Sequence, residues 1–202
     1  SKDFSEIKTY SVKKPYPLFG GAIIDSNGNY YIVYGQSNET DNPDKVVLSV
    51  VKYNSDFKYV SEVIFTGNDT CTYTGSEWGT KMPFDAGNCD IALNGNILVC
   101  NYARQMYNGH QSNHVIYVDI ATMTKVKQAG CYTSHAFDQR VIVTGSGDYL
   151  VVNQGDAYPR GFQVSLSKAG NTDIWDTFNY VPFHFREGSN RDYGYNETYA
   201  QL

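Results

Sequence analysis

The densest group of side chains that could carry out acid–base chemistry lies in residues 132–162. His135 and Asp138 precede a run of β-forming residues, and Asp156 follows a second such run. A Gly-rich turn at 145–148 joins the two runs, which is typical of a β-hairpin. Because a hairpin doubles back, its two flanks lie at the same end of the sheet. We therefore take His135, Asp138 and Asp156 as the candidate catalytic residues.

Side chains that could bind a ligand flank the same hairpin and occur in two other loops. The guanidinium of Arg160 is a planar fork of donors that fits a carboxylate or sugar hydroxyls. Arg140 is expected to face a central channel or to pair with Asp156. The alternative is a purely structural pair of Asp156 with Arg160 or Arg140, which would hold the loop. The candidate ligand-binding residues are Arg140, Tyr158, Arg160, Trp78 and His110.

Three further patterns do not predict a site. His110 and His114 would share a face only on a helix, and this segment enters a strand, so we predict no metal site. The Ser, His and Asp within 134–138 are too close along one strand to converge as a catalytic triad. Residues 25–29 resemble a calcium loop but lack the acid that would follow, so we predict a turn. We predict no cofactor, with calcium as the alternative.

The composition favours an exported β-rich protein. Aromatic residues reach 15% while charged residues are 18%, and the net charge of −5 comes without a basic patch, which argues against a nucleic-acid partner. No apolar run approaches the ~18 residues of a membrane span. Glycosylation sequons begin at Asn38, Asn68 and Asn196. We expect an extracellular or cell-surface location, with Ser1 as the start of a processed or trimmed chain.

The four cysteines, Cys71, Cys89, Cys100 and Cys131, allow three pairings. A two-residue turn at Asn94-Gly95 would place Cys89 directly opposite Cys100, with Cα atoms about 5.5 Å apart. A disulfide there and another between Cys71 and Cys131 are left open, beside the alternative of free thiols.

The chain repeats a unit of four short β-runs joined by tight turns. Glycines 28, 95 and 147 mark the first turn of each copy. The second run of every copy is apolar throughout, as expected for a sheet covered on both faces. No segment has a helical period. The expected strands are 20–25, 30–34, 45–53 and 57–65, then 88–93, 96–101, 114–120 and 124–129, and finally 140–144, 149–153, 161–166 and 175–180.

Such repeats of ~40–50 residues are typical of propeller blades. We predict an all-β fold, a β-propeller of four-stranded antiparallel blades with about three blades present, and a β-sandwich as the runner-up. Three blades do not close a ring, which takes about four to eight, so the chain is a fragment or another chain completes it. Within the domain 1–202 the predicted divisions are a lead-in at 1–18 with an optional outer strand at 7–12, blade one at 19–66, a long loop at 67–87, blade two at 88–131, blade three at 132–181 and a further lead-in at 182–202.

In such a meander, the connections after the second and fourth strands share one rim. The long loops fall on that rim, and function is found disproportionately on loops over a rigid scaffold, so the ligand is expected there. These loops are 36–44, 67–87, 102–113, 132–139 and 154–160.

Two resemblances to known families accompany these patterns. The runs SHAFDQRV and GDAYPRGF, preceded by HQSNH, are similar to runs in uncharacterised bacterial secreted or cell-surface β-propeller proteins. This resemblance covers 110–162 and implies an exported propeller without implying an activity. Residues 19–22, FGGA, resemble the FG-GAP repeat of integrin-type propellers, but the calcium pattern that should follow is incomplete, so no metal site is carried over.

The leading functional prediction is a binding module that recognises a glycan or a surface protein through the loop-bearing rim. The first alternative is a polysaccharide lyase or glycoside hydrolase with His135 or Asp156 as acid or base. A hydrolase usually needs two carboxylates ~5–9.5 Å apart, for which Asp85 and Asp90 are further candidates beside Asp138. The second alternative is a structural part of an assembly in which another chain completes the ring.

Overall fold

The computed structural model describes residues 9–71, 79–85, 87–129, 133, 135–155, 161–167 and 179–184. The structural statements that follow concern these residues. Several residues singled out in the sequence lie outside them: Trp78, Cys131, Ser134, Asp156, Tyr158, Arg160 and Asn196.

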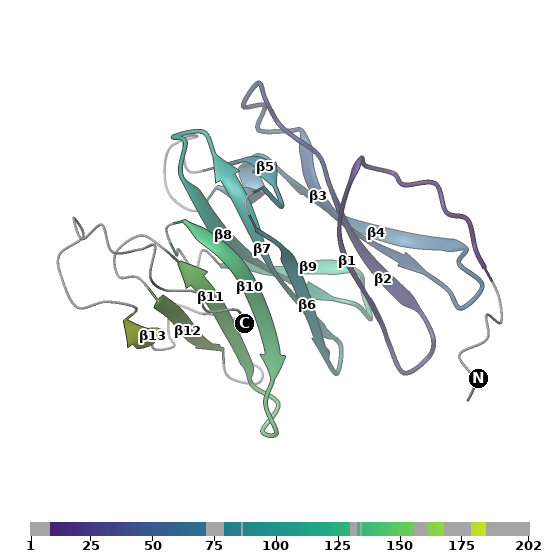
Figure 1. The fold of residues 1–202 in the computed structure, drawn as a ribbon. Coiled ribbons are helices and arrows are strands. Elements are labelled where there is room, and N and C mark those ends of the chain that lie inside the picture. The colour runs from purple at the N-terminus through teal and green to yellow at the C-terminus, as the bar shows by residue number, and fades with distance from the viewer. Residues whose placement is uncertain are drawn as a thin grey trace.

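The fold is all-β, which confirms the predicted class. Three antiparallel sheets follow one another along the chain as consecutive propeller blades, each in meander order (Figure 1). The strands of blade one are β1 (Leu18–Ile24), β2 (Tyr30–Gly35), β3 (Val46–Tyr53) and β4 (Tyr59–Thr66); those of blade two are β5 (Thr80–Pro83), β6 (Cys89–Asn94), β7 (Ile97–Met106), β8 (Gln111–Asp119) and β9 (Thr124–Ala129); those of blade three are β10 (Ala136–Val143), β11 (Tyr149–Gly155), β12 (Gly161–Ser167) and β13 (Asn179–His184).

Helices contribute almost nothing to the described part of the chain. A single 3₁₀ turn, η1 (Asn68–Thr70), follows β4. Among the described residues, no helix is long and apolar enough to cross a membrane.

The blades pack face to face through apolar side chains. Blades one and two share a core that includes Val50, Phe65 and Leu98, and blades two and three share one that includes Val99 and Val151. The strands β1, β6 and β10 lie side by side as the inner strands of the three blades (Figure 1). The continuous apolar runs of the second strands are buried on both faces, which agrees with their sequence pattern.

The two ends of the blades are built differently, and we name them the turn rim and the loop rim. At the turn rim, β1, β6 and β10 end in tight hairpins with left-handed glycines: Gly28, Gly95 and Gly147 have φ of 80°, 57° and 85°. Glycine adopts this conformation without steric cost. At the loop rim the same three strands begin, and the connections from β2, β4, β9 and β11 arrive there.

Several predicted element boundaries are wrong. Residues 102–113 are not a loop, because β7 continues to Met106 and β8 begins at Gln111. The polar side chains of Arg104, Ser112 and Asn113 are buried between sheets with hydrogen-bond partners. The predicted long loop at 67–87 contains β5, which pairs with β7. No strand forms at 9–12, and β13 continues to His184, beyond the predicted end at 180, while 175–178 lie outside the described residues.

The predicted register of the first hairpin in blade two is also wrong. Asn94 pairs with Ile97, so Cys89 lies opposite Tyr102 and is only a diagonal neighbour of Cys100. The turn has two residues, as predicted, but they are Gly95 and Asn96 rather than Asn94 and Gly95, and this shift of one residue moves every pair by two. The two Sγ atoms lie 3.3 Å apart as free thiols. Their hydrogen bond and burial raise the pKa of Cys89.

One of the three sequons is inaccessible in the folded chain. Asn38 is fully buried, and its Nδ2 donates to the Asn42 carbonyl at 2.9 Å. A glycan needs that same nitrogen on the surface. Asn38 is therefore not a glycosylation acceptor in this fold, whereas Asn68 is exposed.

Candidate functional site at the loop rim of β6 and β10

A bulge interrupts the inner strand of blade two. Both β5 and β6 pair with β7, and the residues between them leave the ladder. Ala103 of β7 anchors both ends of the bulge, since its carbonyl accepts from Phe84 N at 2.7 Å and its N–H donates to Asn88 O at 2.8 Å. Phe84 is left-handed, with φ of 63°. Bulges of this kind re-aim side chains and are common beside active sites.

The ring of Phe84 wedges the bulge against blade one. It lies edge-on to Tyr102, with centroids 6.1 Å apart. A Cβ on Gly20 or Gly35 would approach this ring to 2.7 or 2.9 Å, which leaves room only for glycine. The close approach of Phe84 therefore explains why a glycine stands at position 20 in the FGGA run.

Asn88 joins the inner strands of blades two and three. Its N–H donates to Gln139 Oε1 at 2.9 Å, and its Oδ1 accepts from Gln139 N at 2.7 Å. Its Nδ2 donates to Asp138 Oδ1 at 2.8 Å. A Cβ on Gly87 would lie 2.5 Å from Ala103 Cβ and 2.8 Å from Gln139 Oε1, so the strands approach here as closely as a glycine permits.

Asp138 and Arg140 form an ion pair on β10. The Arg140 Nη1 lies 2.8 Å from Asp138 Oδ1 and also donates to the Gln139 carbonyl at 2.9 Å. The Asp138 side chain is 17% exposed and that of Arg140 34%. Asp138 Oδ1 thus accepts from two side chains, which fixes the orientation of its carboxylate.

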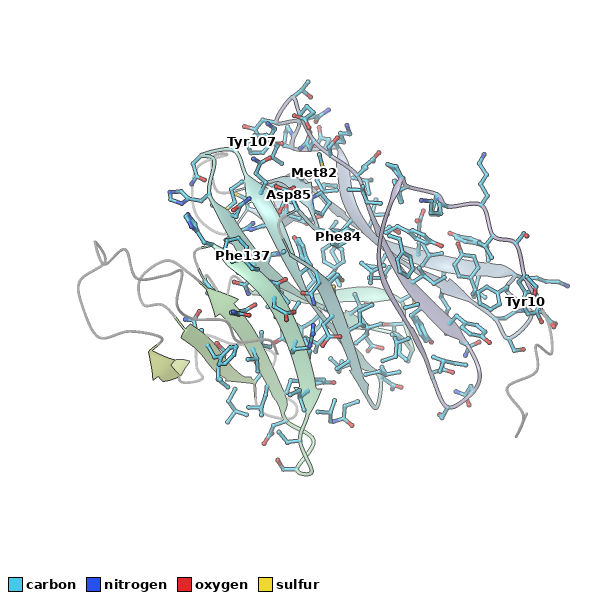
Figure 2. All side chains as sticks on the ribbon, in the orientation of Figure 1. Tyr10, Met82, Phe84, Asp85, Tyr107 and Phe137 are labelled. Carbon is cyan, nitrogen blue, oxygen red and sulfur yellow. The ribbon has the colours of Figure 1, made fainter. Side chains whose placement is uncertain are left out.

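The other two acidic residues nearby differ in their bonding. Asp90 on β6 accepts from Val141 N at 2.8 Å and so ties β6 to β10. Asp85 lies on the bulge, half-buried, and among the described residues its carboxylate has no hydrogen bond and no ion pair. Figure 2 shows Asp85, Phe137 and Tyr107 toward the same end of the inner strands. Of the acidic side chains just described, Asp85 is therefore the one whose carboxylate has no bonded partner among the described residues.

Rings border the carboxylates at this rim. His135 is left-handed, with φ of 51°, and its ring lies 6.5 Å from Phe137 and 6.1 Å from His110. Phe137 is 39% exposed, and His110 is exposed. Carboxylates, a guanidinium, an amide and exposed rings within one rim suit a hydroxyl-rich ligand, whose hydroxyls need acceptors and donors and whose carbon faces need a flat apolar surface.

The residues predicted from the sequence fall into two groups. His135, Asp138, Arg140 and His110 lie at the loop rim on β10 and beside β8. Outside the described residues lie the other candidates, Asp156, Tyr158, Arg160 and Trp78. The predicted pairing of Arg140 with Asp156 therefore lies outside them as well.

The sequence gives no direct signal for two features of this rim. The reciprocal pairing of Asn88 with Gln139 joins residues 51 apart in sequence, and the bulge that carries Asp85 depends on Phe84 reaching blade one. Asp85 appeared in the sequence only as one more carboxylate in the preceding repeat.

The described residues do not assemble a metal site. No group of three His, Cys, Asp or Glu side chains among them is arranged to hold an ion. His114 is buried, 2.9 Å from the Tyr102 hydroxyl, whereas His110 is exposed beside His135, so the two do not converge. The Asp25 carboxylate binds Asn27 N and Asn29 N of its own turn and the Tyr31 hydroxyl, as expected for a turn.

No family model matches the sequence, and no curated protein matches it. The solved structures with a similar arrangement of sheets include a GH43 β-xylosidase/α-arabinofuranosidase from a compost microbial metagenome, in complex with xylotriose. It is 13% identical, with a TM-score of 0.48 over 78% of this chain and 56% of that one. A GH43_1 enzyme from Xanthomonas citri with xylotriose is 12% identical, with a TM-score of 0.44 over 80% and 54%. A GH43 protein from Bacillus licheniformis is 15% identical, with a TM-score of 0.41 over 86% and 33%.

The chain thus spans about half the length of the first solved structures that it matches, 56% and 54%. At these identities and TM-scores, the similarity assigns no residue of this chain a role, because one sheet arrangement carries many functions.

Proposed function

We propose that the loop rim of β6 and β10 binds a glycan and hydrolyses its glycosidic bonds. The observation that carries the proposal is a pair of unlike carboxylates at one rim: Asp138 on β10 is held by two donors, and Asp85 on the bulge before β6 has no partner among the described residues. Glycoside hydrolysis commonly uses two carboxyl groups in different roles. The likeness to GH43 enzymes concerns the same reaction class but is too distant to add to this argument.

The bonding of each carboxylate suggests its role. Asp138 is oriented by Asn88 and Arg140 and would act as the nucleophile or general base. Neither oxygen of Asp85 has a partner among the described residues, and Asp85 would act as the general acid toward the leaving oxygen. Phe137 would pack against the carbon face of a sugar unit, and Arg140 would also donate to its hydroxyls.

The test is release of reducing ends from a panel of neutral and uronic-acid polysaccharides. Asp85→Asn and Asp138→Asn each keep the shape of the side chain and remove its proton-transfer capacity. We expect each to lower kcat at least about 100-fold, the usual size of acid–base contributions. Asp56→Asn, on an exposed turn at the turn rim, is the matched control and should stay within about twofold of the parent chain.

Two outcomes would overturn hydrolysis. Saturable glycan binding without product, weakened by both Asn variants, would replace it with the glycan-binding module of the leading sequence prediction. Products that carry an unsaturated uronic acid would replace it with a lyase. Neither binding nor product from any polymer in the panel would reject the glycan site itself.

A further inference from the structure

The outer face of blade one, opposite blade two, is covered by the N-terminal segment 9–17 rather than by a sheet. Ile32, Tyr34, Val51 and Tyr53 form the buried layer of this face, and Val12 and Tyr16 pack onto it. The Tyr10 ring stacks on Phe57 at 4.9 Å. Among the described residues no sheet covers this face, and Tyr59 at its edge remains exposed.

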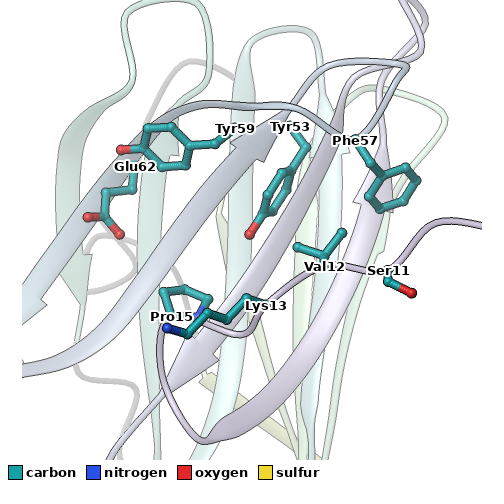
Figure 3. A pocket seen from close by; sticks show the side chains of 8 residues that line it. All are labelled: Ser11, Val12, Lys13, Pro15, Tyr53, Phe57, Tyr59 and Glu62. Carbon is teal, nitrogen blue, oxygen red and sulfur yellow. The ribbon is translucent and has the colours of Figure 1, made fainter.

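A cavity remains between the segment and the sheet. Its volume is about 400 Å³, which lies within the ~300–1,000 Å³ of small-molecule sites. Figure 3 shows the Tyr53 side chain between those of Tyr59 and Phe57, with Lys13 and Pro15 of the N-terminal segment below it. The lining residues are Ser11, Val12, Lys13, Pro15, Tyr53, Phe57, Tyr59 and Glu62.

Three rings form the walls of this cavity. Tyr53 is 4% exposed, with Phe57 tilted beside it at 6.1 Å and Tyr59 edge-on at 6.5 Å. Burial and a hydrogen bond with Tyr34 raise the pKa of Tyr53, so its hydroxyl stays neutral. Tyr59 is 60% exposed, which is unusual for a large ring and leaves a flat apolar surface at the opening.

Two charged groups of opposite sign complete the lining. The Glu62 Oε2 accepts from the buried Ser49 Oγ at 2.8 Å, so the carboxylate is held in place, and its other oxygen has no partner among the described residues. The Lys13 ammonium likewise has no partner there. The cavity therefore offers a fixed acceptor and three donor hydrogens with no net charge.

We propose that this cavity binds one sugar unit of a neutral glycan, at a site separate from the loop rim. The Tyr59 ring would stack on the carbon face of the sugar, while Glu62 accepts from and Lys13 donates to its hydroxyls. Because the charges of Lys13 and Glu62 cancel, the lining favours neither an organic cation nor an anion overall. A neutral ligand that both accepts and donates hydrogen bonds satisfies both groups at once.

The experiment is isothermal titration of the full chain with β-1,4-linked trisaccharides of glucose, mannose and xylose. We expect saturable binding by at least one of them, weakened at least tenfold in Tyr59→Ala and at least threefold in Glu62→Gln. Val60→Ala, at an exposed neighbour on β4 outside the cavity lining, is the matched control and should bind as the parent does. Because Tyr59 and Val60 are both largely exposed, their variants should fold. A thermal melt of each variant checks this.

The outcomes also separate this site from the loop rim. Binding that Tyr59→Ala and Glu62→Gln leave unchanged, but that Asp85→Asn and Asp138→Asn weaken, would overturn this inference and support the proposed function. Binding weakened only by the blade-one variants would support this inference whatever the activity at the rim. Absence of saturable trisaccharide binding would overturn it, and so would an oligoproline peptide that binds in place of the sugars.

Discussion

The two halves of the blades differ in what they bury. The half near the turn rim is packed with apolar side chains such as Leu98, Val118 and Ile120. The half near the loop rim buries polar groups between the same sheets, with Arg104, His114 and Asn101 all inaccessible to solvent. Apolar burial stabilises the fold directly, whereas each buried polar group needs a partner to offset its desolvation.

The hydrogen bonds of the loop-rim half are extensive but incomplete. Arg104 donates to Ser112 Oγ at 3.0 Å and to the Thr70 carbonyl at 2.7 Å, and Asn101 donates to Asn153 Oδ1 at 3.0 Å. Among the described residues, the buried Gln139 Nε2, Asn153 Nδ2 and His114 Nε2 have no partner. Hydrogen bonds in this half therefore fix the positions and orientations of its polar side chains, but the buried polar atoms without a partner lower the stability of the fold. The candidate site lies in the same half.

The largest expected effect comes from removing a buried apolar side chain near the turn rim. Leu98→Ala should lower the free energy of unfolding by about 2–5 kcal/mol, because the side chain is fully buried and leaves a cavity. Leu98→Met, which conserves volume, should lose less than about 1.5 kcal/mol. Chemical denaturation measures both. A loss below about 0.5 kcal/mol for Leu98→Ala, which is the range of surface substitutions, would contradict the contrast between the halves.

The polar half should make stability depend on pH. Burial, reinforced by the charge of Arg104, holds the pKa of His114 well below its usual value, and its Nδ1 meets the Tyr102 hydroxyl. The unfolded chain takes up a proton at His114 near pH 6.5 while the folded chain resists it. Stability is therefore full above about pH 6.5 and falls as the pH drops toward the folded pKa, by up to about 1.4 kcal/mol per pH unit.

The control for this pH dependence is His114→Gln. This variant should be less stable at pH 7.5 but should lose less further stability between pH 7 and pH 5. Denaturation midpoints across that range measure the difference. An unchanged pH slope in His114→Gln would assign the dependence to other groups.

The smallest expected effect concerns the turn rim hairpins. Gly95 has φ of 57° and no atom within 4 Å of a Cβ placed on it, so Gly95→Ala should lose about 1–2 kcal/mol from backbone strain alone. Gly145 has the same open surroundings without a positive φ, and Gly145→Ala should lose nothing and gain up to about 1 kcal/mol. Equal losses in the two variants would show that these turns are not fixed by glycine conformation.

Much of the fold could be predicted from the sequence, because its determinants are local. The glycines at 28, 95 and 147 fix the hairpins, and the apolar second strands require cover on both faces. The prediction failed where polar residues were read as surface. Residues 112–114 are polar and buried, since neighbouring strands supply their partners, and no local pattern distinguishes that case from a loop.

The candidate site divides in the same way. The sequence by itself placed His135, Asp138 and Arg140 near the same end of an inner strand, since the hairpin pattern is a local property. It placed the start of that strand at Arg140, whereas β10 already begins at Ala136, so Asp138 and Arg140 both lie within the strand. Only the tertiary structure decided that Asn88 bridges to Asp138 and that Phe84 holds the bulge carrying Asp85. Both depend on the close approach of separate blades. Contacts between distant segments depend on how the side chains of separate blades fit together, and no local sequence pattern specifies that fit.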